Sequence, residues 1–384
     1  MKLVVQILQA LGFTSENGDR VARAKAFVAV TVLWVILPGL VYVVRQHSSN
    51  FGAAMKSFEE VVLIAKVVLH ASKTIRNRVE LEQIYKDLEE ALGRTCDKLN
   101  GEIQRKMAVL ERRLNFMLNV YLRFEMFAIV GYCLLPPTVF IIRYLIETDQ
   151  LLDFPNTSFE ADFYFFDYKS SLAMWLGTSF ITTIVGAIVI ISGAALDCFS
   201  WGLLYRISEL FQIVAMRIRC LDEFKETEKF HVELTNLIDV QELANRSARK
   251  MENFLSELVL YLFGVCICVL CAIMLVLSMS NVDHQLLLSM GIALWYVLFQ
   301  LFSYSMLGTA LITASTSVAE AIYETKWYER INSEQRNILF VLMRSQKMVP
   351  LTVGKSLTVH RATFGAVLRS AFSYYSVLRQ LYNE

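Results

Sequence analysis

The last helix expected in this chain carries hydroxyl and other polar side chains along one face, a pattern that suits contact with water. Eight positions follow one another at steps of four and three, which places them on one helical face. They are Thr352, Ser356, His360, Thr363, Val367, Ser370, Tyr374 and Val377. Such a face either lines an aqueous pore or forms a polar seam between helices, and the residues alone leave both interpretations open.

Residue types that carry out enzymatic chemistry are present but scattered. The five histidines fall on different predicted loops and spans: His47, His70, His231, His284 and His360. Neither a glycine-rich phosphate loop nor a nucleophile elbow occurs. Cys266, Cys268 and Cys271 share one apolar run, where small packing residues are a more ordinary interpretation than a metal site. We therefore expect no enzyme, no cofactor and no metal.

The composition favours a polytopic membrane protein made only of helices. Of the 384 residues, 55% are hydrophobic and 19% are charged, and the mean hydropathy is +0.45. Soluble domains are usually less apolar and more charged. Only 5 prolines and 16 glycines interrupt the chain, which favours long helices. A net charge of +1 argues against nucleic acid as a partner and leaves membrane lipid as the expected surroundings.

Seven transmembrane helices in a single domain, 1–384, account for the pattern. The first apolar run follows Arg20, Arg23 and Lys25 and precedes no cleavage site, so we expect it to stay in the protein. The second span is weak because Glu59, Glu60 and Lys66 interrupt it. Spans four to six exceed the length of a bilayer, so their polar ends should continue as helices into the cytoplasm. The spans are approximately 26–46, 54–78, 108–146, 170–221, 229–280, 285–329 and 335–382. Pro350 and Gly354 divide the last one, and its pore helix is expected at about 355–382.

The distribution of charge predicts the orientation of these spans. Lysine and arginine concentrate before span one and in alternate loops, whereas the loop at 147–169 is acidic. The positive-inside rule then places the N-terminus in the cytoplasm and the C-terminus outside the cell. The sequon at Asn156 falls in an outer loop, where glycosylation requires it. G-protein-coupled receptors have the opposite orientation, and their Asp-Arg-Tyr and Asn-Pro-x-x-Tyr motifs do not follow the third span or end the seventh.

The C-terminal part of the chain carries a set of residues in a recognisable order. They are Gly308, Ser317, Val318, Ala321, Tyr323, Trp327, Tyr328, Arg344 to Lys347, Leu351, Gly354, Phe364, Ser373, Tyr374, Leu378 and Arg379. Phe166-Asp167 in the outer loop and Leu196-Asp197 in span four add to the pattern. With these residues the chain resembles the insect odorant receptor family. One departure is Asp239, near a position where family members often carry histidine.

The resemblance implies an odorant-binding subunit of a ligand-gated, non-selective cation channel in the plasma membrane of an olfactory neuron, in its dendrite. It implies a heterotetramer with a shared co-receptor subunit, in which the seventh helices surround the pore, and a small volatile organic odorant as ligand. The chain lacks the long insertion of the co-receptor between spans four and five, so it resembles the odour-tuning subunit. A gustatory receptor channel subunit and a G-protein-coupled receptor are the alternatives.

The resemblance also assigns site residues. Val377 matches the position that constricts the pore, and the pore and gate candidates are His360, Ser370, Tyr374, Val377 and Gln380. Trp327 and Tyr328 are expected to form a cytoplasmic anchor with span seven, although an interfacial aromatic belt is the alternative. Odorants should bind in the outer half, between spans two to six. The candidates, each of which could instead be ordinary packing, are Val61, Ile64, Gly131, Tyr132, Leu135, Trp175, Thr178, Thr182, Trp295, Tyr296 and Phe299.

Overall fold

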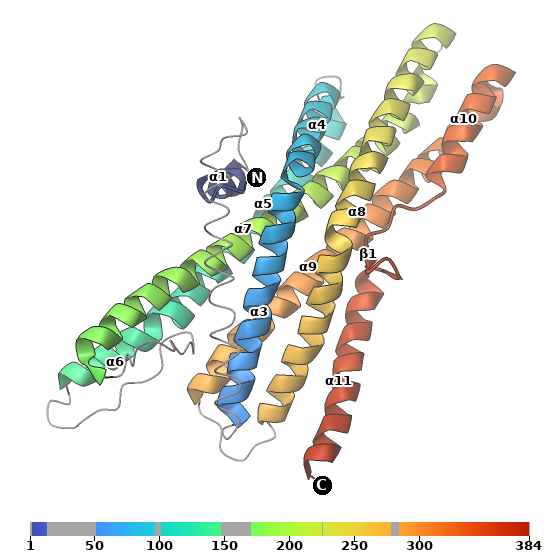
Figure 1. Cartoon of the computed structure of the whole chain (residues 1–384). Coiled ribbons are helices and arrows are strands. Elements are labelled where there is room, and N and C mark those ends of the chain that lie inside the picture. Colours follow the sequence, from blue (N-terminus) through green and yellow to red (C-terminus); the bar gives the residue numbers. More distant parts are fainter. Residues whose placement is uncertain are drawn as a thin grey trace.

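Long helices lying side by side make up the protein, with one short hairpin between the last two (Figure 1). The computed structural model describes residues 2–13, 51–96, 101–146, 170–224, 226–277 and 284–383. The first predicted span, 26–46, and the loop that holds Asn156 lie outside the described residues. The elements are α1 (Lys2–Ala10), α3 (Phe51–Arg76), α4 (Arg78–Cys96), α5 (Gly101–Ala128), η2 (Ile129–Leu134), α6 (Leu135–Ile146), α7 (Leu172–Arg219), η4 (Leu221–Glu223), α8 (Thr227–Leu277), α9 (His284–Glu324), η5 (Trp327–Glu329), α10 (Asn332–Ser345), β1 (Thr352–Val353), β2 (Leu357–Thr358) and α11 (Arg361–Asn383).

Four helical segments within the described residues are long and apolar enough to cross a membrane. They are Met107–Ile146, Leu172–Glu223, Thr227–Leu277 and Leu286–Glu324. The chain is therefore a helical, multi-pass membrane protein. Because a bilayer needs about 20 helical residues, α7 with 48 and α8 with 51 residues must extend well beyond its apolar core. Helix α3 is not among these four segments, because charged residues such as Glu59, Glu60 and Lys66 lie along it.

The third predicted span is interrupted near its middle. Helix α5 continues into the π-helical segment η2 before α6 begins at Leu135. Pro136 and Pro137 lie directly after this segment and cannot donate the backbone hydrogen bonds of a regular α-helix. Their missing donors account for the local change in helical hydrogen bonding, a feature that often occurs at functional sites.

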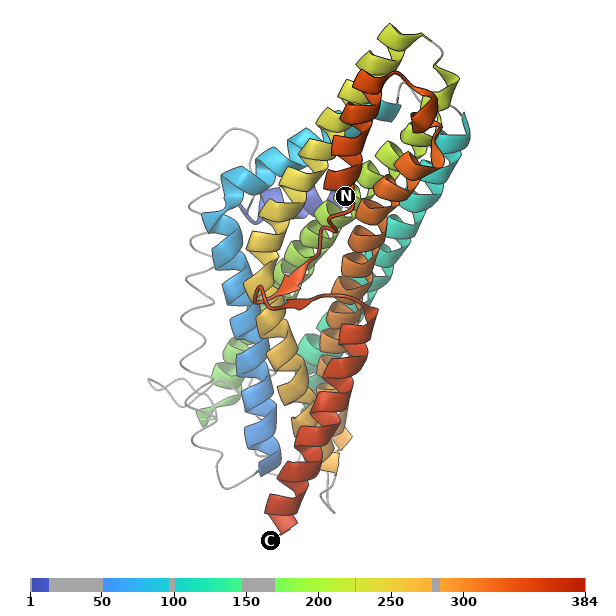
Figure 2. The ribbon, with the colours of Figure 1, turned by 90° about the vertical axis from the view of Figure 1, so that its right-hand side faces the viewer.

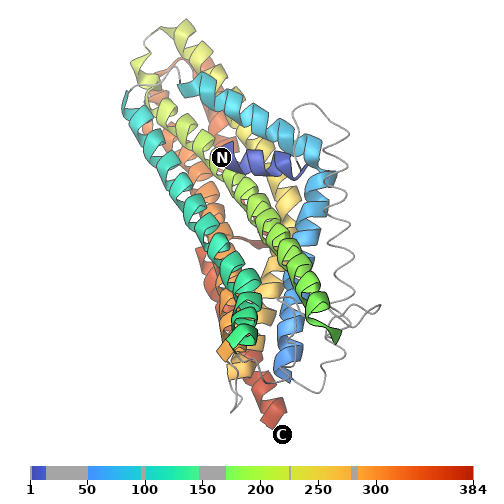
Figure 3. The same cartoon turned by 90° about the vertical axis from the view of Figure 1, so that its left-hand side faces the viewer.

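Helix α7 forms the centre of the molecule and crosses behind α3 and α8 at a steep angle (Figures 1 and 3). The run from Ser192 to Leu204 is entirely buried, and small residues such as Gly193 allow neighbouring helices to approach closely. A methyl group at Gly193 would lie 3.1 Å from Val67 on α3. Trp201 completes this core, with its ring centroid 4.7 Å from that of Tyr121 on α5.

The seventh predicted span, about 335–382, consists of two helices, and the division lies near Pro350 and Gly354. A hairpin of β1 and β2 separates α10 from α11 (Figure 2). Gly354 and Lys355 both have positive φ, of 54° and 62°, in its turn. Ser256 on α8 fixes the turn, because its carbonyl accepts from the Gly354 amide at 3.1 Å and its hydroxyl accepts from the Lys355 amide at 2.9 Å.

The pore helix therefore begins at Arg361 and not near residue 355. Thr352 lies on β1 and Ser356 in the turn, so helical spacing does not apply to either of them. The end of the hairpin packs tightly on α9. A methyl group on Gly308 would come within 2.3 Å of the carbonyl oxygen of Val359, so only glycine fits there.

Candidate functional site

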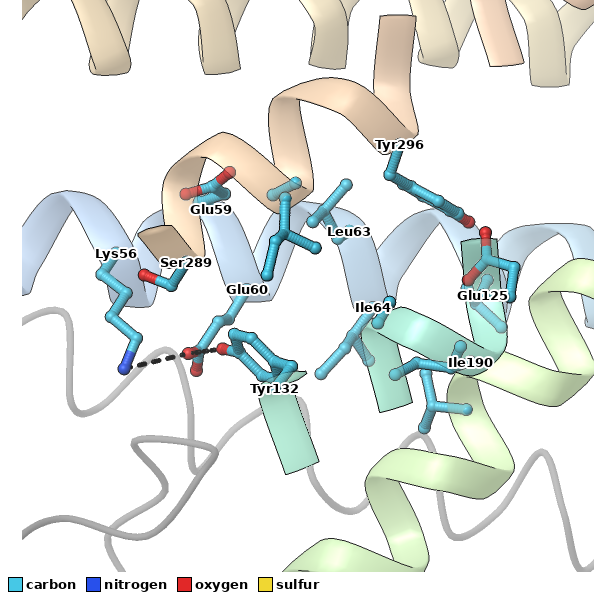
Figure 4. A pocket seen from close by; sticks show the side chains of 15 residues that line it. Lys56, Glu59, Glu60, Leu63, Ile64, Glu125, Tyr132, Ile190, Ser289 and Tyr296 are labelled. Atoms are coloured by element: carbon cyan, nitrogen blue, oxygen red, sulfur yellow. Dashed lines mark hydrogen bonds and ion pairs between the residues drawn. The ribbon is translucent and has the colours of Figure 1, made fainter. Parts of the chain in front are cut away.

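A cavity of about 110 Å³ lies between α3, the α5–η2 segment, α7 and α9 (Figure 4). It is lined by Lys56, Glu59, Glu60, Leu63, Ile64, Val67, Glu125, Ala128, Tyr132, Val189, Ile190, Ser289, Ile292, Ala293 and Tyr296. An apolar cavity of roughly 150 Å³ in another protein binds benzene, so a space of this order suits a small organic molecule. Apolar side chains dominate the walls, as they do in most small-molecule sites.

Helical periodicity explains which residues reach the cavity. On α3 the lining positions Lys56, Glu60, Ile64 and Val67 are spaced by four, four and three residues, which keeps them on one face. On α9 the positions from Ser289 to Tyr296 follow the same rule. The cavity is thus the space between the facing sides of packed helices.

Charged and hydroxyl groups gather at one end of the cavity. Glu60 accepts a hydrogen bond from the Tyr132 hydroxyl, and its carboxylate lies 3.8 Å from the Lys56 ammonium (Figure 4). Glu59 lies on the neighbouring position of α3 and is only 4% exposed. These ionisable groups lie on α3, which packs within the helical bundle of a membrane protein. Charged side chains there are costly unless they pair with one another or reach water.

At the other end, Tyr296 and Glu125 point toward one another (Figure 4). Tyr296 also forms the boundary between the cavity and a polar cluster behind it, because the Lys66 ammonium lies 5.7 Å from its ring centroid. Glu125 is 4% exposed, and its Oε1 has no hydrogen-bond partner among the described residues.

The polar cluster behind the cavity is centred on Asp197 of α7, which is fully buried. Both of its carboxylate oxygens accept hydrogen bonds from the Lys66 ammonium, at 2.8 and 2.7 Å. Tyr121 donates to it at 3.3 Å and the Gln300 amide at 2.5 Å, while the His70 ring lies 3.3 Å away. One carboxylate therefore connects α3, α5, α7 and α9.

Three of the eleven predicted ligand-binding residues line the cavity, namely Ile64, Tyr132 and Tyr296. Gly131 lies close to it, because a methyl group there would meet Ile292 at 3.7 Å. Phe299 lies deeper and stacks on Tyr121 with centroids 5.4 Å apart.

The structure places the remaining candidates away from the cavity. Trp295 is 52% exposed, and its ring packs on that of Phe124. It is not among the residues that line the cavity. Trp175 is buried against Phe140, at a centroid distance of 4.5 Å. The hydroxyls of Thr178 and Thr182 donate to backbone carbonyls of α7. Val61 and Leu135 are likewise not among the lining residues.

The lining residues that the sequence analysis missed include the charged groups Lys56, Glu59, Glu60 and Glu125. A signal for three of them was present. Their positions on α3 share one helical face, and an ionisable residue inside a membrane span is a functional candidate by default. Glu125 had no such signal, because its place depends on how α5 packs against α3 and α9.

The pore candidates on α11 are exposed on the single subunit. Tyr374 is 57% and Val377 54% exposed, and Ser370 and Gln380 are exposed as well. Thr363 and Val367, on the same predicted stripe, are buried instead. His360 precedes the helix, and its ring contacts the Thr363 hydroxyl.

The anchor candidates lie in η5, at the end of α9. Trp327 is partly buried, and Tyr328 is 61% exposed with its ring nearly perpendicular to that of Trp327. The next turn is fixed by Arg330, whose guanidinium lies 4.2 Å from the Phe230 ring centroid and donates to the Phe224 carbonyl at 3.1 Å.

Comparison with known proteins decides the family. The model of the family described as 7tm Odorant receptor matches residues 50–372 of this chain. The chain belongs to the odorant receptor family. This is a family of receptors and not of enzymes. The matched residues include α3, α7 and α9, which carry the cavity and the Asp197 cluster, and about half of α11.

The sequences of individual relatives match this odorant receptor only in part and at low identity. Odorant receptor Or2 of Anopheles gambiae is 25% identical over 162 residues, which are 42% of this chain and 40% of that protein. The odorant receptor coreceptor of Drosophila melanogaster is 34% identical over 88 residues, 23% of this chain and 18% of that protein. The chain thus spans less than half the length of these curated relatives.

The fold agrees with a solved structure over almost the whole chain. The structure of the insect olfactory receptor OR5 from Machilis hrabei in complex with eugenol superposes with a TM-score of 0.83 at 16% identity. The match covers 99% of this chain and 98% of the other.

Proposed function

We propose that this protein is the odorant-binding subunit of a heterotetrameric, ligand-gated, non-selective cation channel in the plasma membrane of olfactory neurons. The observation that carries the proposal is the small, mostly apolar cavity between four long helices. A volatile organic molecule binds chiefly by burying apolar surface, and such a cavity supplies it. The relative from Machilis hrabei, described in complex with eugenol, supports a small volatile ligand.

The proposed partner is the odorant receptor co-receptor, and the proposed role of this chain is the odour-tuning subunit. Only residues 220–226 separate α7 from α8, so the connection has no room for a long insertion. The similarity to coreceptors of several insects supports a shared architecture. In the proposed orientation the N-terminus is cytoplasmic, Asn156 is extracellular and glycosylated, and η5 with Trp327 and Tyr328 lies in the cytoplasm as an anchor.

The proposed ion pathway runs along α11. Its exposed residues Ser370, Tyr374, Val377 and Gln380 have no cover within the described part of the chain, which suits a face that meets equivalent helices around an axis. Val377 would place an apolar side chain in the constriction, and a ring of such side chains closes a pore by excluding water.

Current recording tests the proposal directly. The chain is expressed in cells with and without a co-receptor, and a panel of volatile compounds is applied. We expect odour-evoked cation current only when both chains are present. Strong odour-gated current from this chain alone would show that it is not a tuning subunit, and the absence of current with surface-expressed partners would contradict the channel assignment.

A further inference from the structure

Helix α11 stands at the edge of the bundle, and only one side of it is covered by other helices (Figure 1). On the covered side, the Cys271 thiol of α8 donates to the Ala371 carbonyl at 3.5 Å. Phe364 packs on Phe302 of α9, with ring centroids 5.8 Å apart. The side turned away from α8 and α9 is exposed on the single subunit.

An arginine lies on this exposed side. Arg369 begins a series of exposed residues at steps of four, four and three, which continues through Ser373, Val377 and Gln380. Residues at this spacing share one face of a helix. Arg369 also points about 160° away from Ala371 on the helical wheel, because two helical residues turn by about 200°. It therefore shares the face that carries the proposed constriction at Val377.

The charge of Arg369 has no counter-charge in the described part of the chain. Helix α11 contains no acidic residue, and the guanidinium makes no ion pair or hydrogen bond with any described residue. Its Nη1 atom folds back toward Gly365, where a methyl group would lie 3.5 Å from it. A charged side chain at membrane depth is costly unless it meets water or a partner. An aqueous pathway beside this face supplies the water.

We propose that Arg369 lines the ion pathway and sets its selectivity among cations, by disfavouring divalent ions relative to monovalent ones. Arg369 precedes Val377 by eight residues, which is about 12 Å along the helix axis. In the proposed orientation it lies on the cytoplasmic side of the constriction, so it acts on ions that Val377 has let through. This inference rests on the proposed function and adds a determinant of ion selectivity to it.

The physical reason is the charge of the permeating ion. A fixed positive charge repels a divalent cation with twice the energy with which it repels a monovalent one. In water, at a separation of roughly 6 Å, one guanidinium lowers the local concentration of a monovalent cation about threefold and that of a divalent cation about tenfold. The ratio of divalent to monovalent ions falls about threefold, and dissolved salt weakens the effect.

Reversal potentials with calcium on one side of the membrane and sodium on the other measure this ratio. The wild-type chain, Arg369→Gln, Arg369→Glu and Arg369→Lys are each expressed with the co-receptor, and odour-evoked current is recorded. We expect the calcium-to-sodium permeability ratio to rise about threefold in Arg369→Gln and further in Arg369→Glu. It should stay unchanged in Arg369→Lys, which keeps the charge. Equal ratios in all four channels would overturn the inference.

Ionic strength and a matched substitution separate a local charge from a change in structure. The shift in Arg369→Gln should grow in low salt, because screening is weaker there, whereas a rearranged helix would give a shift independent of salt. Arg112 is an exposed arginine of α5, and Arg112→Gln should leave the permeability ratio unchanged. An equal shift in Arg112→Gln would contradict the placement of Arg369. Loss of co-purification with the co-receptor in both Arg369→Gln and Arg369→Glu would instead place the guanidinium at a subunit contact and would also contradict it.

Thiol labelling gives a readout that does not require current. The complexes that carry Arg369→Cys or Phe372→Cys are reconstituted in lipid nanodiscs and treated with a water-soluble maleimide, and the labelling of native cysteines in the wild type is subtracted. The new thiol at position 369 should react, and that at position 372, on a different exposed side of α11, should not. Protection of both positions would overturn the inference whether or not current flows. Absence of odour-evoked current from the wild-type complex would contradict the proposed function itself, whereas strong current with unchanged permeability contradicts only the role of Arg369.

Discussion

The buried carboxylates of this protein fall into two groups that differ in how completely their oxygens are satisfied. Asp197, at the centre of the bundle, is surrounded by four polar side chains from three other helices. Glu59 and Glu125, at the cavity, each keep an oxygen without a partner in the described structure. Glu59 and Glu125 line the cavity, and Asp197 belongs to the polar cluster behind the lining residue Tyr296.

This difference indicates two uses for buried charge. A carboxylate that collects every available donor fixes the relative positions of the helices that supply them. A carboxylate that keeps one oxygen without a partner connects fewer helices, as Glu125 does through its interaction with the Tyr121 hydroxyl. Tyr296 stands between the two groups, so an occupied cavity and the Asp197 cluster share a wall.

The largest effect is expected for Asp197→Ala. The substitution leaves the Lys66 ammonium buried without its counter-charge, and breaking one side of a buried pair typically costs about 3–5 kcal/mol. The unfolding temperature and the amount of folded protein in size-exclusion chromatography should both fall strongly. A variant as stable as the wild type would remove the distinction between the two groups of carboxylates.

An exposed ion pair serves as the control for that variant. The Lys73 ammonium lies 2.7 Å from a Glu257 side chain that is 79% exposed. Glu257→Ala should cost less than about 1 kcal/mol, because water screens such pairs. The double change of Lys66→Met with Asp197→Leu should recover part of the lost stability, since it removes both buried charges together.

The second prediction has the opposite sign. Glu125→Leu removes a buried oxygen that lacks a partner, and an unsatisfied group of this kind costs about 1–3 kcal/mol, which offsets the loss of about 1 kcal/mol from the interaction with the Tyr121 hydroxyl. The unfolding temperature of the ligand-free protein should stay equal or rise. A loss of stability comparable with that of Asp197→Ala would place Glu125 in the structural group.

The sequence predicted the helices better than it predicted the cavity. Long apolar runs and few prolines were sufficient to predict an all-helical membrane protein, and the family resemblance led to Tyr296. The charges of α3 were interpreted as interruptions of a weak span, although Lys56, Glu59 and Glu60 mark one face of it. Glu125 could not be assigned, because nothing local in α5 reveals which side chains other helices bring opposite to it.

The hairpin also escaped the sequence analysis, for a different reason. Residues 352–358 form strands of only two residues each, too short for a period of two to stand out. Its stability comes from distant groups, namely Ser256 on α8 and the close approach to Gly308 on α9. The helical spacing counted from Thr352 was therefore coincidental up to Arg361, where the helix begins.

A third prediction compares two neighbouring aromatic residues of α9. Tyr296 borders the cavity, so Tyr296→Ala should change ligand potency by about tenfold, the amount that 1.4 kcal/mol of lost contact produces. Trp295→Ala should change potency by less than about threefold, a difference of under 1 kcal/mol, because that ring is half exposed and packs on Phe124. Concentration–response curves measure both. A larger effect of Trp295→Ala would place the ligand outside the cavity described above.

The smallest effect, a change in basal current, is expected at α11, whose Ser370, Tyr374, Val377 and Gln380 are exposed on the single subunit. Val377 lies on the exposed face of this helix, and in the proposed tetramer it faces the equivalent helices of the other subunits. Val377→Ser should wet the constriction, because a hydroxyl group holds water where an isopropyl group excludes it. Basal current should rise modestly, since only some of the four subunits carry the change, and the ranking of ligands should stay the same.

Phe372→Ser, on a different exposed side of α11, is the control and should leave basal current unaltered. Cysteines introduced at positions 374 and 377 should react with a water-soluble thiol reagent and block current, whereas one at 372 should not. An equal response at all three positions would show that α11 forms a packing seam and does not line the ion pathway.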